Sequence, residues 1–429
     1  MRYWERQVAL SADPLRVAAT LAATSTDDNV LYENHGTISW GEGAYATVTV
    51  RAGEPLSVVA SRLAEVDVED WRAYGWAAFE LSYALHDLGD LPDVDVVTLM
   101  IPRREVRFEN GSVLLRALTV SDVEALESRL AEAVLTGGIE PADARVVVDV
   151  DDHDAETYRA AVALGVAEIR SGALDKVILS RVVPVPEDID MPATYLTGRV
   201  QNSPARSFLL RLGGWEALGF SPEIVIGVSP DGQVVTQPLA GTRAFFGDEE
   251  ADQARRDELY RDAKEVFEHA ISVRLAAVEL SSVCTPSSVR VEEFMSVKER
   301  GSVQHLASQL SGTLAEGRTS WDAFAALFPA VTASGIPKAP ACELIRRAET
   351  RTRGLYSGAV LTVEPDGAMD AALILRSVFR RDGETWLRAG AGIVAQSTPE
   401  RELEETREKL CSVSRFLVPA LQPAVPAVS

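Results

Sequence analysis

Cysteine is scarce in this sequence. Only Cys284, Cys342 and Cys411 occur among 429 residues, and no two of them form a Cys-x-x-Cys pair. The odd number argues against a disulfide framework. No apolar run approaches the roughly 20 residues that a membrane span needs, and the first residues, MRYWERQVAL, lack the apolar stretch of a secretory signal. We therefore expect a soluble cytoplasmic protein with no membrane segment.

Positive charge is also in deficit. The chain has 42 lysines and arginines against 64 aspartates and glutamates, which gives a net charge of −22. This imbalance argues against binding to nucleic acid or to an anionic membrane. An anionic small molecule can still bind such a protein, provided that positive charge is concentrated at the site.

The common motifs of nucleotide and hydrolytic chemistry are missing. The sequence contains no GxGxxG after a strand, no Walker A sequence, no HExxH and no GxSxG. Its five histidines form no cluster with metal-ligand spacing. The chemistry must therefore come from other groups of residues.

The order of expected elements indicates the fold class. Asp-Gly turns at 231–232, 366–367 and 382–383 separate apolar runs, which is typical of antiparallel hairpins. Helical periodicity occurs in separate segments, of which the longest runs from about 250 to 280. The pattern predicts an α+β fold in which helices cover layered strands.

Several helix boundaries can also be predicted. A helix over 121–135 should end at Gly137-Gly138, and another should begin after Asp154 as its N-cap. The last helix should begin at Ser397, which has capping-box spacing to Glu400. The segment 136–145 is the best candidate for a linker.

Two pairs of glutamates stand out. Glu265 and Glu268 lie in KEVFEHA (264–270), and Glu402 and Glu405 lie in RELEET (401–406). Residues three apart share one face of a helix. Two such faces turned inward could surround a hard cation, for which Mg²⁺ is the best candidate. The alternative is two solvated helix faces, which is the more common meaning of this spacing.

Three other polar residues lie in apolar surroundings. Lys176 begins the apolar strand 176–183, where the alternative is an edge lysine that faces water. Glu223 precedes IVIGV, and partial desolvation there would raise its pKa and suit it to general acid chemistry. Arg376 lies within the predicted strand AALILRSVF and needs a carboxylate, either internal or from a ligand.

Two glycine-containing segments, AGT at 240–242 and GAG at 390–392, follow predicted strands. Glycine allows backbone N–H groups to approach an anion closely.

A series of segments, taken in order, resembles the chorismate-utilising enzymes, and within that family the salicylate synthases of siderophore pathways. Together the segments cover most of 150–415, and weaker resemblance extends to YENHGT (32–37) and GWAAFE (75–80). The segments are DKVILSR (175–181), SFLLRLGG (207–214), GFSPEIV (219–225), PLAGTRA (238–244), KEVFEHAISVR (264–274), ERGSVQHLAS (299–308), FPAVTASGIPKA (328–339), GLYSGAV (354–360), TWLRAGAGI (385–393) and PERELEETREKL (399–410).

The resemblance implies a single, monomeric chorismate-binding domain over 1–418, with two packed antiparallel β-sheets surrounded by helices. Within it, 1–145 would form the N-terminal part and 146–418 the catalytic core, and 419–429 would be a flexible tail. The implied reaction depends on Mg²⁺. Chorismate is hydrated at C2 with loss of the C4 hydroxyl to give isochorismate, and pyruvate is then eliminated to leave salicylate.

The resemblance also implies roles for single residues. Lys176 would be the general base that activates water, and Glu223 the general acid on the leaving hydroxyl. Glu268 and Glu405 would be the main Mg²⁺ ligands, and Glu265 and Glu402 would support them. Arg376 and Tyr356 would hold the carboxylate of the enolpyruvyl side chain. The other residues implied around the substrate are Gly241, Thr242, His305, Thr332, Gly390, Gly392 and Lys409.

Three alternatives remain open from the sequence. An isochorismate synthase that stops after the first step would use the same base, acid and metal residues; the segment VTASGIPK (331–338) favours the two-step reaction. An ammonia-using relative, such as an anthranilate synthase component I, is disfavoured by Lys176, which the resemblance associates with water. Ala240 also replaces the lysine of aminodeoxychorismate synthases, and we expect no glutamine amidotransferase partner. The third alternative is a ligand-binding protein without activity.

Overall fold

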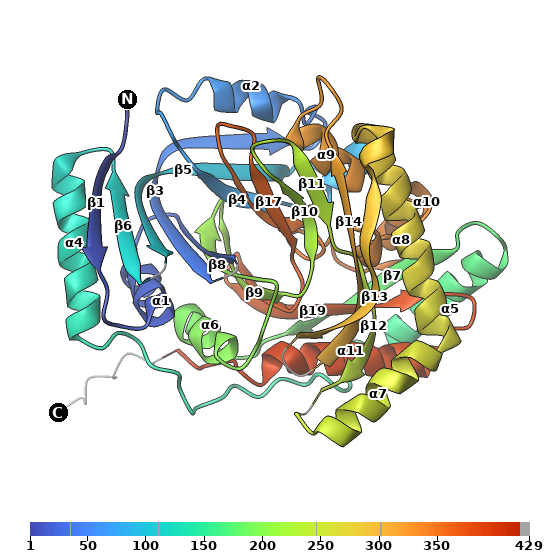
Figure 1. The fold of residues 1–429 in the computed structure, drawn as a ribbon. Helices are drawn as coiled ribbons and strands as arrows, with labels where there is room; N and C mark the ends of the chain where they lie inside the picture. The colour runs from blue at the N-terminus through green and yellow to red at the C-terminus, as the bar shows by residue number, and fades with distance from the viewer. Residues whose placement is uncertain (35, 110, 246, 301–302, 421–429) are drawn as a thin grey trace.

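A computed structural model of the chain describes residues 1–34, 36–109, 111–245, 247–300 and 303–420 (Figure 1). Every strand pairing recorded among these residues is antiparallel. Helices lie around the strands, and α8 and α11 flank them on the side where β12, β13 and β19 lie. The α+β class predicted from the sequence is confirmed.

Two sheets share the long strands β3 (Thr37–Arg51) and β5 (Asp95–Glu109), which pair along most of their length. The first sheet continues through β1 (Trp4–Ala9), β6 (Ser112–Ala117), β2 (Asn29–Asn34), β8 (Arg206–Leu212), β9 (Trp215–Ser221), β18 (Ser377–Arg381), β19 (Glu384–Ile393), β7 (Lys176–Pro184) and β15 (Gly335–Ile336). The second continues through β4 (Ala73–Ala77), β16 (Ala359–Val363), β17 (Met369–Leu373), β10 (Ile224–Val228), β11 (Gln233–Thr236), β14 (Val303–Thr313), β12 (Leu239–Ala244) and β13 (Arg290–Arg300).

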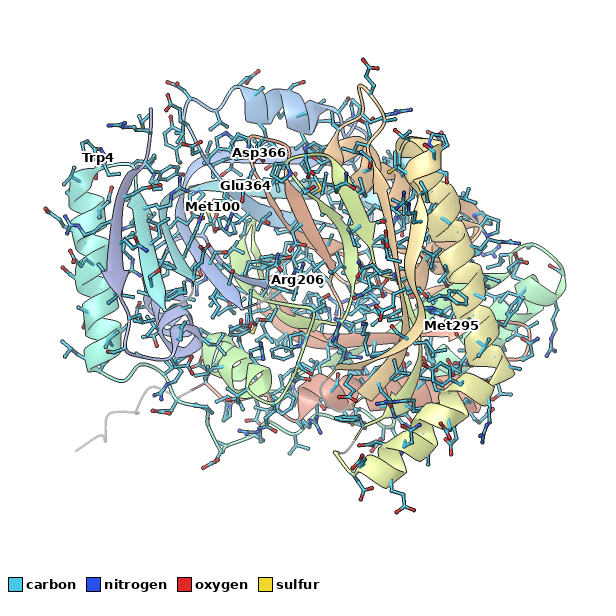
Figure 2. All side chains as sticks on the ribbon, in the orientation of Figure 1. Trp4, Met100, Arg206, Met295, Glu364 and Asp366 are labelled. Atoms are coloured by element: carbon cyan, nitrogen blue, oxygen red, sulfur yellow. The ribbon has the colours of Figure 1, made fainter. Side chains whose placement is uncertain are left out.

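A hydrophobic core lies between the two sheets. Trp76 on β4 and Val360 on β16 belong to the same buried cluster as Phe208 on β8 and Phe379 on β18. A polar contact also joins the two sheets: Nε of Arg206 on β8 (labelled in Figure 2) lies 2.6 Å from Oδ2 of Asp370 on β17. Two packed sheets are therefore present, as predicted, and β3 and β5 join them into one hydrogen-bonded network.

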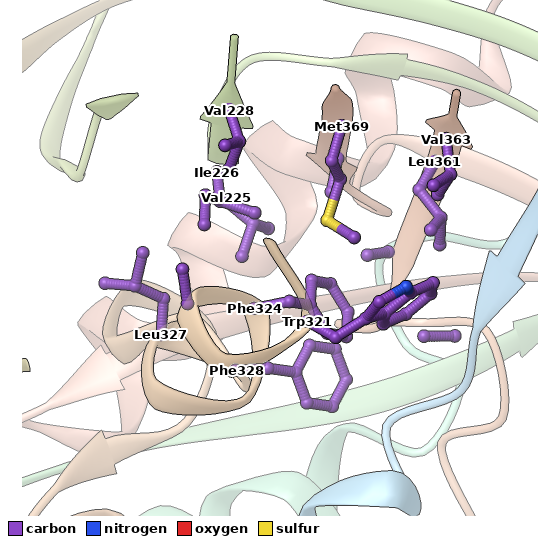
Figure 3. Packing of buried hydrophobic residues seen from close by; sticks show 14 of the residues in the cluster. Val225, Ile226, Val228, Trp321, Phe324, Leu327, Phe328, Leu361, Val363 and Met369 are labelled. Atoms are coloured by element: carbon purple, nitrogen blue, oxygen red, sulfur yellow. The ribbon is translucent and has the colours of Figure 1, made fainter. Parts of the chain in front are cut away.

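A second cluster packs under helix α9 (Ser320–Leu327) on the outer face of the second sheet. Trp321, Phe324 and Phe328 contact the apolar side chains of β10, β16 and β17 there (Figure 3). The other helices are α1 (Pro14–Thr24), α2 (Val58–Ala64), α3 (Leu81–Leu85), α4 (Val120–Leu135), α5 (Ala155–Arg170), α6 (Met191–Arg199), α7 (Glu249–Arg261), α8 (Ala263–Val283), α10 (Lys338–Ala348) and α11 (Pro399–Ser414). In the part of the chain that the structure describes, none of these helices has the length and apolar character needed to cross a membrane.

The single helix predicted from about 250 to 280 is wrong, because the chain forms α7 and α8 with a break at Asp262. The backbone of Asp262 is extended (φ −74°, ψ 106°), which ends α7. Its side chain then caps α8, since Oδ1 accepts hydrogen bonds from the backbone N–H groups of Lys264 (3.0 Å) and Glu265 (3.3 Å). The first turns of α8, which carry Glu265 and Glu268, pack against β12.

The predicted strand AALILRSVF is also wrong as a single element. It is split into β17 and β18, which belong to different sheets. Arg376, which precedes β18, adopts a left-handed conformation with φ 51°. The chain therefore passes from one sheet to the other at this residue, and the Arg376 side chain is free of the strand geometry that the sequence predicted.

Two predicted helix caps differ as well. The N-cap of α11 is Thr398, whose side chain accepts from Arg401 N, whereas Ser397 Oγ accepts from Val394 N instead. Asp154 occupies the N-cap position of α5, but its side chain makes no capping bond and its φ is 57°. Residues 421–429 of the predicted tail lie outside the described residues, and Ala420 N still donates to Asp188 O (2.9 Å).

Replacing Asp262 with alanine should lower the free energy of unfolding by about 1–2 kcal/mol, because it removes a helix N-cap and the ion pair with Arg243 (2.6 Å). Urea denaturation would measure the loss. Ser57→Ala is the matched control, since Ser57 occupies the N-cap position of α2 without a side-chain bond. Equal losses in the two variants would contradict the assigned cap.

Candidate active site

A cavity with about 850 Å³ of empty space, including its mouth, opens among β12, β14, β19 and α11. Its volume is in the range of small-molecule sites. Most of the residues that the sequence analysis placed around a substrate line it, whereas Lys176, Glu265 and Glu402 lie behind the wall. The predicted residues that line it are Glu223, Gly241, Thr242, Glu268, His305, Thr332, Tyr356, Arg376, Gly390, Gly392, Glu405 and Lys409.

The four glutamates predicted to surround a cation are buried on α8 and α11, so the alternative of two solvated helix faces is wrong. Glu265, Glu268 and Glu405 are between 5% and 9% exposed, and Glu402 is fully buried. Burial raises the pKa of Glu265 to about 7, and the neighbouring carboxylates of Glu405 and Glu268 contribute to that increase. The two helices therefore bring their acidic faces close together.

Each of these carboxylates has one basic partner. Burial alone would raise the pKa of Glu405, but Lys409 and Lys264 outweigh it and lower that pKa to about 2. The basic groups therefore keep this part of the acidic cluster ionised. The four pairs are Lys176 Nζ with Glu268 Oε1 (2.9 Å), Lys409 Nζ with Glu405 Oε1 (2.8 Å), Lys264 Nζ with Glu402 Oε1 (2.8 Å) and Arg243 Nη1 with Glu265 Oε1 (3.4 Å).

The four carboxylates of this cluster are chemically suited to bind a hard divalent cation. Their side chains are, however, turned toward their basic partners. As they stand, no three His, Cys, Asp or Glu side chains among the described residues are grouped to hold a metal ion. All four nearby donors are carboxylates, the ligands that Mg²⁺ prefers. The repulsion that raises the Glu265 pKa is also what a bound cation would relieve.

Lys176 is fully buried, so an edge lysine that faces water is excluded. The short strand β15 covers β7 at this point and pairs Ile336 with Lys176. Besides Glu268, the amine contacts Ser272 Oγ (3.1 Å), which itself donates to Glu268 O (2.8 Å). The sequence analysis missed Ser272, although its position four residues after Glu268 puts it on the same helix face.

Glu223 lies between β9 and β10 and is 4% exposed. Burial raises its pKa to about 8, which agrees with the desolvation expected from the sequence. The hydroxyl of Thr332 donates to Glu223 Oε1 (2.6 Å) and opposes part of this increase. Glu223 can therefore hold a proton near neutral pH at the cavity wall.

Arg376 provides a half-buried positive charge at the cavity wall. Burial and the nearby Arg300 lower its pKa to about 10. Its Nη1 donates to Arg300 O (3.3 Å) and its Nη2 contacts His305 Nε2. Within the described ranges, Arg376 forms no ion pair with Asp or Glu, so the internal carboxylate that it needs is not provided by these residues. A ligand carboxylate remains the partner expected from the sequence.

His305 is kept neutral beside this arginine. Burial and Arg376 both lower its pKa. Its Nδ1 lies 3.2 Å from Gly241 O and 3.1 Å from Thr242 Oγ1. With the proton on Nδ1 donated to Gly241 O, Nε2 is left to accept from Arg376. The ring thus orients the guanidinium without competing with it for an anion.

The segment GAG of β19 forms the wall beside α11. Gly390 O accepts a hydrogen bond from Lys409 Nζ (2.9 Å). At Gly392, any Cβ would clash with the carboxylate of Glu268. A side chain at 392 would therefore displace the Glu268 carboxylate from the position in which it pairs with Lys176.

Tyr356 lies between two arginines that the sequence analysis did not assign. The guanidinium groups of Arg353 and Arg388 lie 5.6 Å and 5.4 Å from its ring centroid, and Arg388 also lines the cavity. Lys264 and Arg243 were missed as well, although both occur inside the segments KEVFEHAISVR and PLAGTRA. Their partners could be found only once the helices were placed.

Comparison with known proteins agrees with this site. Residues 18–415 match the family described as chorismate binding enzyme. The chain belongs to this family. Among its relatives, the chain is 42% identical to the salicylate synthase of Mycolicibacterium paratuberculosis over 95% of this chain and 94% of that protein. It is 37% identical to anthranilate synthase component 1 of Thermus thermophilus over 82% of this chain and 77% of that protein.

Solved structures of chorismate-binding enzymes share the fold. The menaquinone-specific isochorismate synthase of Escherichia coli superposes with a TM-score of 0.76 at 23% identity, over 96% of this chain and 94% of that one. Anthranilate synthase component I of Streptococcus pneumoniae gives a TM-score of 0.71, also at 23% identity, over 96% and 92% of the two chains. At this identity, both likenesses concern the fold alone.

Replacing Gly392 with alanine should lower the free energy of unfolding by about 1–3 kcal/mol, because the added methyl group overpacks a closed site against Glu268. Urea denaturation would measure this. Gly227→Ala is the control, since a Cβ at Gly227 on β10 meets no atom within 4 Å, and its effect should be smaller. The same loss in both variants would refute the close approach of Glu268.

Proposed function

We propose that this chorismate-binding enzyme converts chorismate into isochorismate and then into salicylate and pyruvate, for siderophore or related natural-product biosynthesis. The observation that carries the proposal is one cavity lined by the protonatable Glu223, the cationic Arg376 and Glu268, with Lys176 paired to Glu268 directly behind the wall. It occurs in a chain that is 42% identical to a salicylate synthase over nearly its whole length.

Substrate binding would rely on local positive charge. Chorismate is a dianion, and the protein carries −22. Arg376 and Tyr356 would hold the carboxylate of the enolpyruvyl side chain, with help from the backbone at Gly390 and Gly392. Lys409 adds positive charge at the wall. These groups make the cavity suitable for an anion in spite of the overall charge.

The first step is an exchange of hydroxyl groups. Lys176, in its neutral form, takes a proton from a water molecule as the water oxygen bonds to C2 of the ring. The double bonds shift, and the hydroxyl at C4 leaves as water after Glu223 donates its proton. A general acid with a pKa near 8 is suited to this work at neutral pH.

The metal ion of the proposal is Mg²⁺. Glu268 and Glu405, which line the cavity, are the main candidates to hold it, and Glu265 and Glu402 lie behind them in support. When bound, Mg²⁺ supplies positive charge that binds and polarises the ring carboxylate of chorismate. Lys176 and Lys409 would then have to exchange their carboxylate partners for other contacts.

The second step eliminates pyruvate from isochorismate. It moves the hydrogen on C2 of the ring to the methylene carbon of the enolpyruvyl group while the bond between ring C3 and the ether oxygen breaks, so that this oxygen leaves as the keto oxygen of pyruvate. A shaped pocket that holds the side chain over the ring serves this step better than another acid or base. Tyr356, Arg376 and the GAG segment are the candidates to hold it.

The strand pairing also bears on the domain organisation of the chain. We infer that residues 1–418 act as one domain, because strands from both sides of residue 145 pair with each other. The enzyme is proposed to be a cytoplasmic monomer without an amidotransferase subunit. Lys176 and Ala240 favour water over ammonia as the nucleophile.

The decisive experiment incubates the purified protein with chorismate, with and without Mg²⁺, and follows products by chromatography. We expect salicylate and pyruvate in equal amounts, and their loss with a chelator. Lys176→Ala should reduce turnover by about 10²–10⁴-fold because the general base is gone, whereas Arg6→Ala, on β1 at the opposite edge of the first sheet and outside the cavity lining, should not. If isochorismate is the sole product, the protein is an isochorismate synthase that stops after the first step. If anthranilate forms with ammonium, it is an ammonia-using relative. Either result would contradict the proposed function.

The pH dependence follows from Glu223. The general acid must be protonated, and its pKa is raised to about 8, so kcat/KM should fall as pH rises through about 8. Thr332→Val removes a hydrogen bond that stabilises the ionised carboxylate of Glu223. The pKa of Glu223 should therefore rise, and the fall in kcat/KM should move to higher pH. Steady-state kinetics over a range of pH would measure the pH at which kcat/KM falls. If this pH is unchanged or lower in Thr332→Val, Glu223 is not the general acid.

A further inference from the structure

A buried ion network lies directly behind the cavity wall. It consists of Glu349, which follows α10, Arg353 in the loop before β16, and Arg388 on β19; their side chains are at most 3% exposed. Glu349 Oε1 accepts from Arg353 Nη2 (2.7 Å), and Oε2 accepts from Arg353 Nε (2.9 Å). Arg388 Nη2 shares Oε2 at 2.5 Å. One carboxylate therefore holds two guanidinium groups in fixed orientations.

The remaining donors of Arg353 reach two segments of the active site. Nη2 donates to Ile178 O (2.8 Å) on β7, two residues beyond Lys176. Nη1 donates to Ala333 O (2.7 Å), in the residue after Thr332. Thr332 in turn donates to Glu223. A single side chain thus links the strand that begins with the proposed base to the turn that supports the proposed acid.

The same arginine also contacts Tyr356. Its guanidinium lies 5.6 Å from the ring centroid, and its backbone O accepts from Tyr356 N (3.1 Å). Ile178, Ala333, Tyr356 and Arg388 all line the cavity. Arg353 also lies over the ring of Phe79 (4.4 Å), and neither Phe79 nor Glu349 lines the cavity. The contacts with Ile178, Ala333 and Tyr356 link it to the walls of the site, and Arg353 itself does not line it.

Stability alone is a weak explanation for such a network. Removing several charges from water is costly, and well-packed apolar residues often stabilise a core equally well. What an apolar side chain cannot supply is a planar set of donors that fixes several acceptors at once. Arg353 uses its donors on acceptors from three segments, which is a geometric function.

We propose that Arg353 is a positioning residue that sets the distance and orientation between Lys176 and Glu223. It acts through Ile178 O on one side and through Ala333 and Thr332 on the other, and touches no substrate. This role rests on the proposed function, because it concerns the base and the acid of that reaction.

Arg353→Lys tests the idea, because lysine keeps the charge but cannot reach all of these acceptors. We expect kcat for chorismate consumption to fall by about 10–100-fold, as small misplacements of reacting groups do. KM should change by less than about threefold, since Arg376 and Lys409 are untouched. Arg116→Lys is the matched control: Arg116 is also buried, pairs with the buried Glu105 (2.7 Å) and also bonds Glu5 and Asp70 O, but it lines no part of the cavity.

The control separates positioning from stability. Both lysine variants should lower the melting temperature, but only Arg353→Lys should lower kcat. Combining Arg353→Lys with Thr332→Val should reduce kcat by less than the product of the two single effects, because the two residues act through the same acid. A fully multiplicative result, an unchanged kcat, or an equal fall in kcat in Arg116→Lys would overturn the proposal.

Glu349→Gln provides a second variant in case Arg353→Lys does not fold. It weakens the ion pairs that orient Arg353 and keeps the hydrogen bonds to Ile178 O and Ala333 O within reach. We expect a fall in kcat in the same direction, and an unchanged kcat would again overturn the role. The wild-type assay keeps the two ideas apart: a wild type that forms no isochorismate or salicylate refutes the proposed function, whereas an active wild type with an equally active Arg353→Lys refutes only the positioning.

Discussion

The ion pair between Lys176 and Glu268 joins the first sheet to helix α8, and the rest of the site is arranged around it. Both charges are buried, so neither can lose the other without leaving an uncompensated charge, at a cost of about 3–5 kcal/mol. Three other features follow from this constraint. A side chain at Gly392 would displace the carboxylate, Ser272 accepts a second hydrogen bond from the amine, and β15 covers the lysine from solvent. The pair also places a proposed base beside a proposed metal ligand before any substrate binds.

Charge in this site is balanced locally, although the chain as a whole is strongly acidic. Four carboxylates on α8 and α11 each meet a lysine or an arginine. On the other side of the cavity, Arg376 has a neutral histidine beside it, and within the described residues it forms no ion pair. The cavity thus presents an acidic wall whose charges are compensated and a basic wall whose charge is available. In the proposed function, that asymmetry would favour one orientation of the dianionic substrate.

The sequence predicted the parts of the fold that depend on local patterns. The α+β class followed from the Asp-Gly hairpins, and the acidic faces of α8 and α11 followed from glutamates three residues apart. Two features were not predicted: a helix break and a change of sheet. Nothing in the helix-forming residues on either side of Asp262 marks the break, because its cause is a side chain that caps the next helix. Arg376 appeared to lie within one strand because the apolar residues continue while the chain changes sheets.

The candidate site could also be predicted only in part from the sequence. Residues inside recognisable segments, such as Glu223 and Lys409, were found to line one cavity. The burial of Lys176 depends on a strand of two residues, Gly335 and Ile336, which is too short to show any periodicity. Arg353 and Glu349 were missed because their partners are mostly backbone carbonyl groups and each other, and such contacts leave no pattern in the sequence.

The sharing of β3 and β5 between the two sheets affects how the protein can be made. Strand β4 pairs with β16, so that Ala77 lies opposite Ala359, and β2 pairs with β8. Although β2 and β4 can pair early with β3 and β5, their other edges stay unpaired until β8 and β16 have been synthesised. Closure of both sheets must wait until nearly the whole polypeptide has emerged. Such long-range pairing slows folding and leaves apolar strands open to aggregation, so growth temperature and chaperone supply should limit the yield of this enzyme more than the stability of the finished fold does.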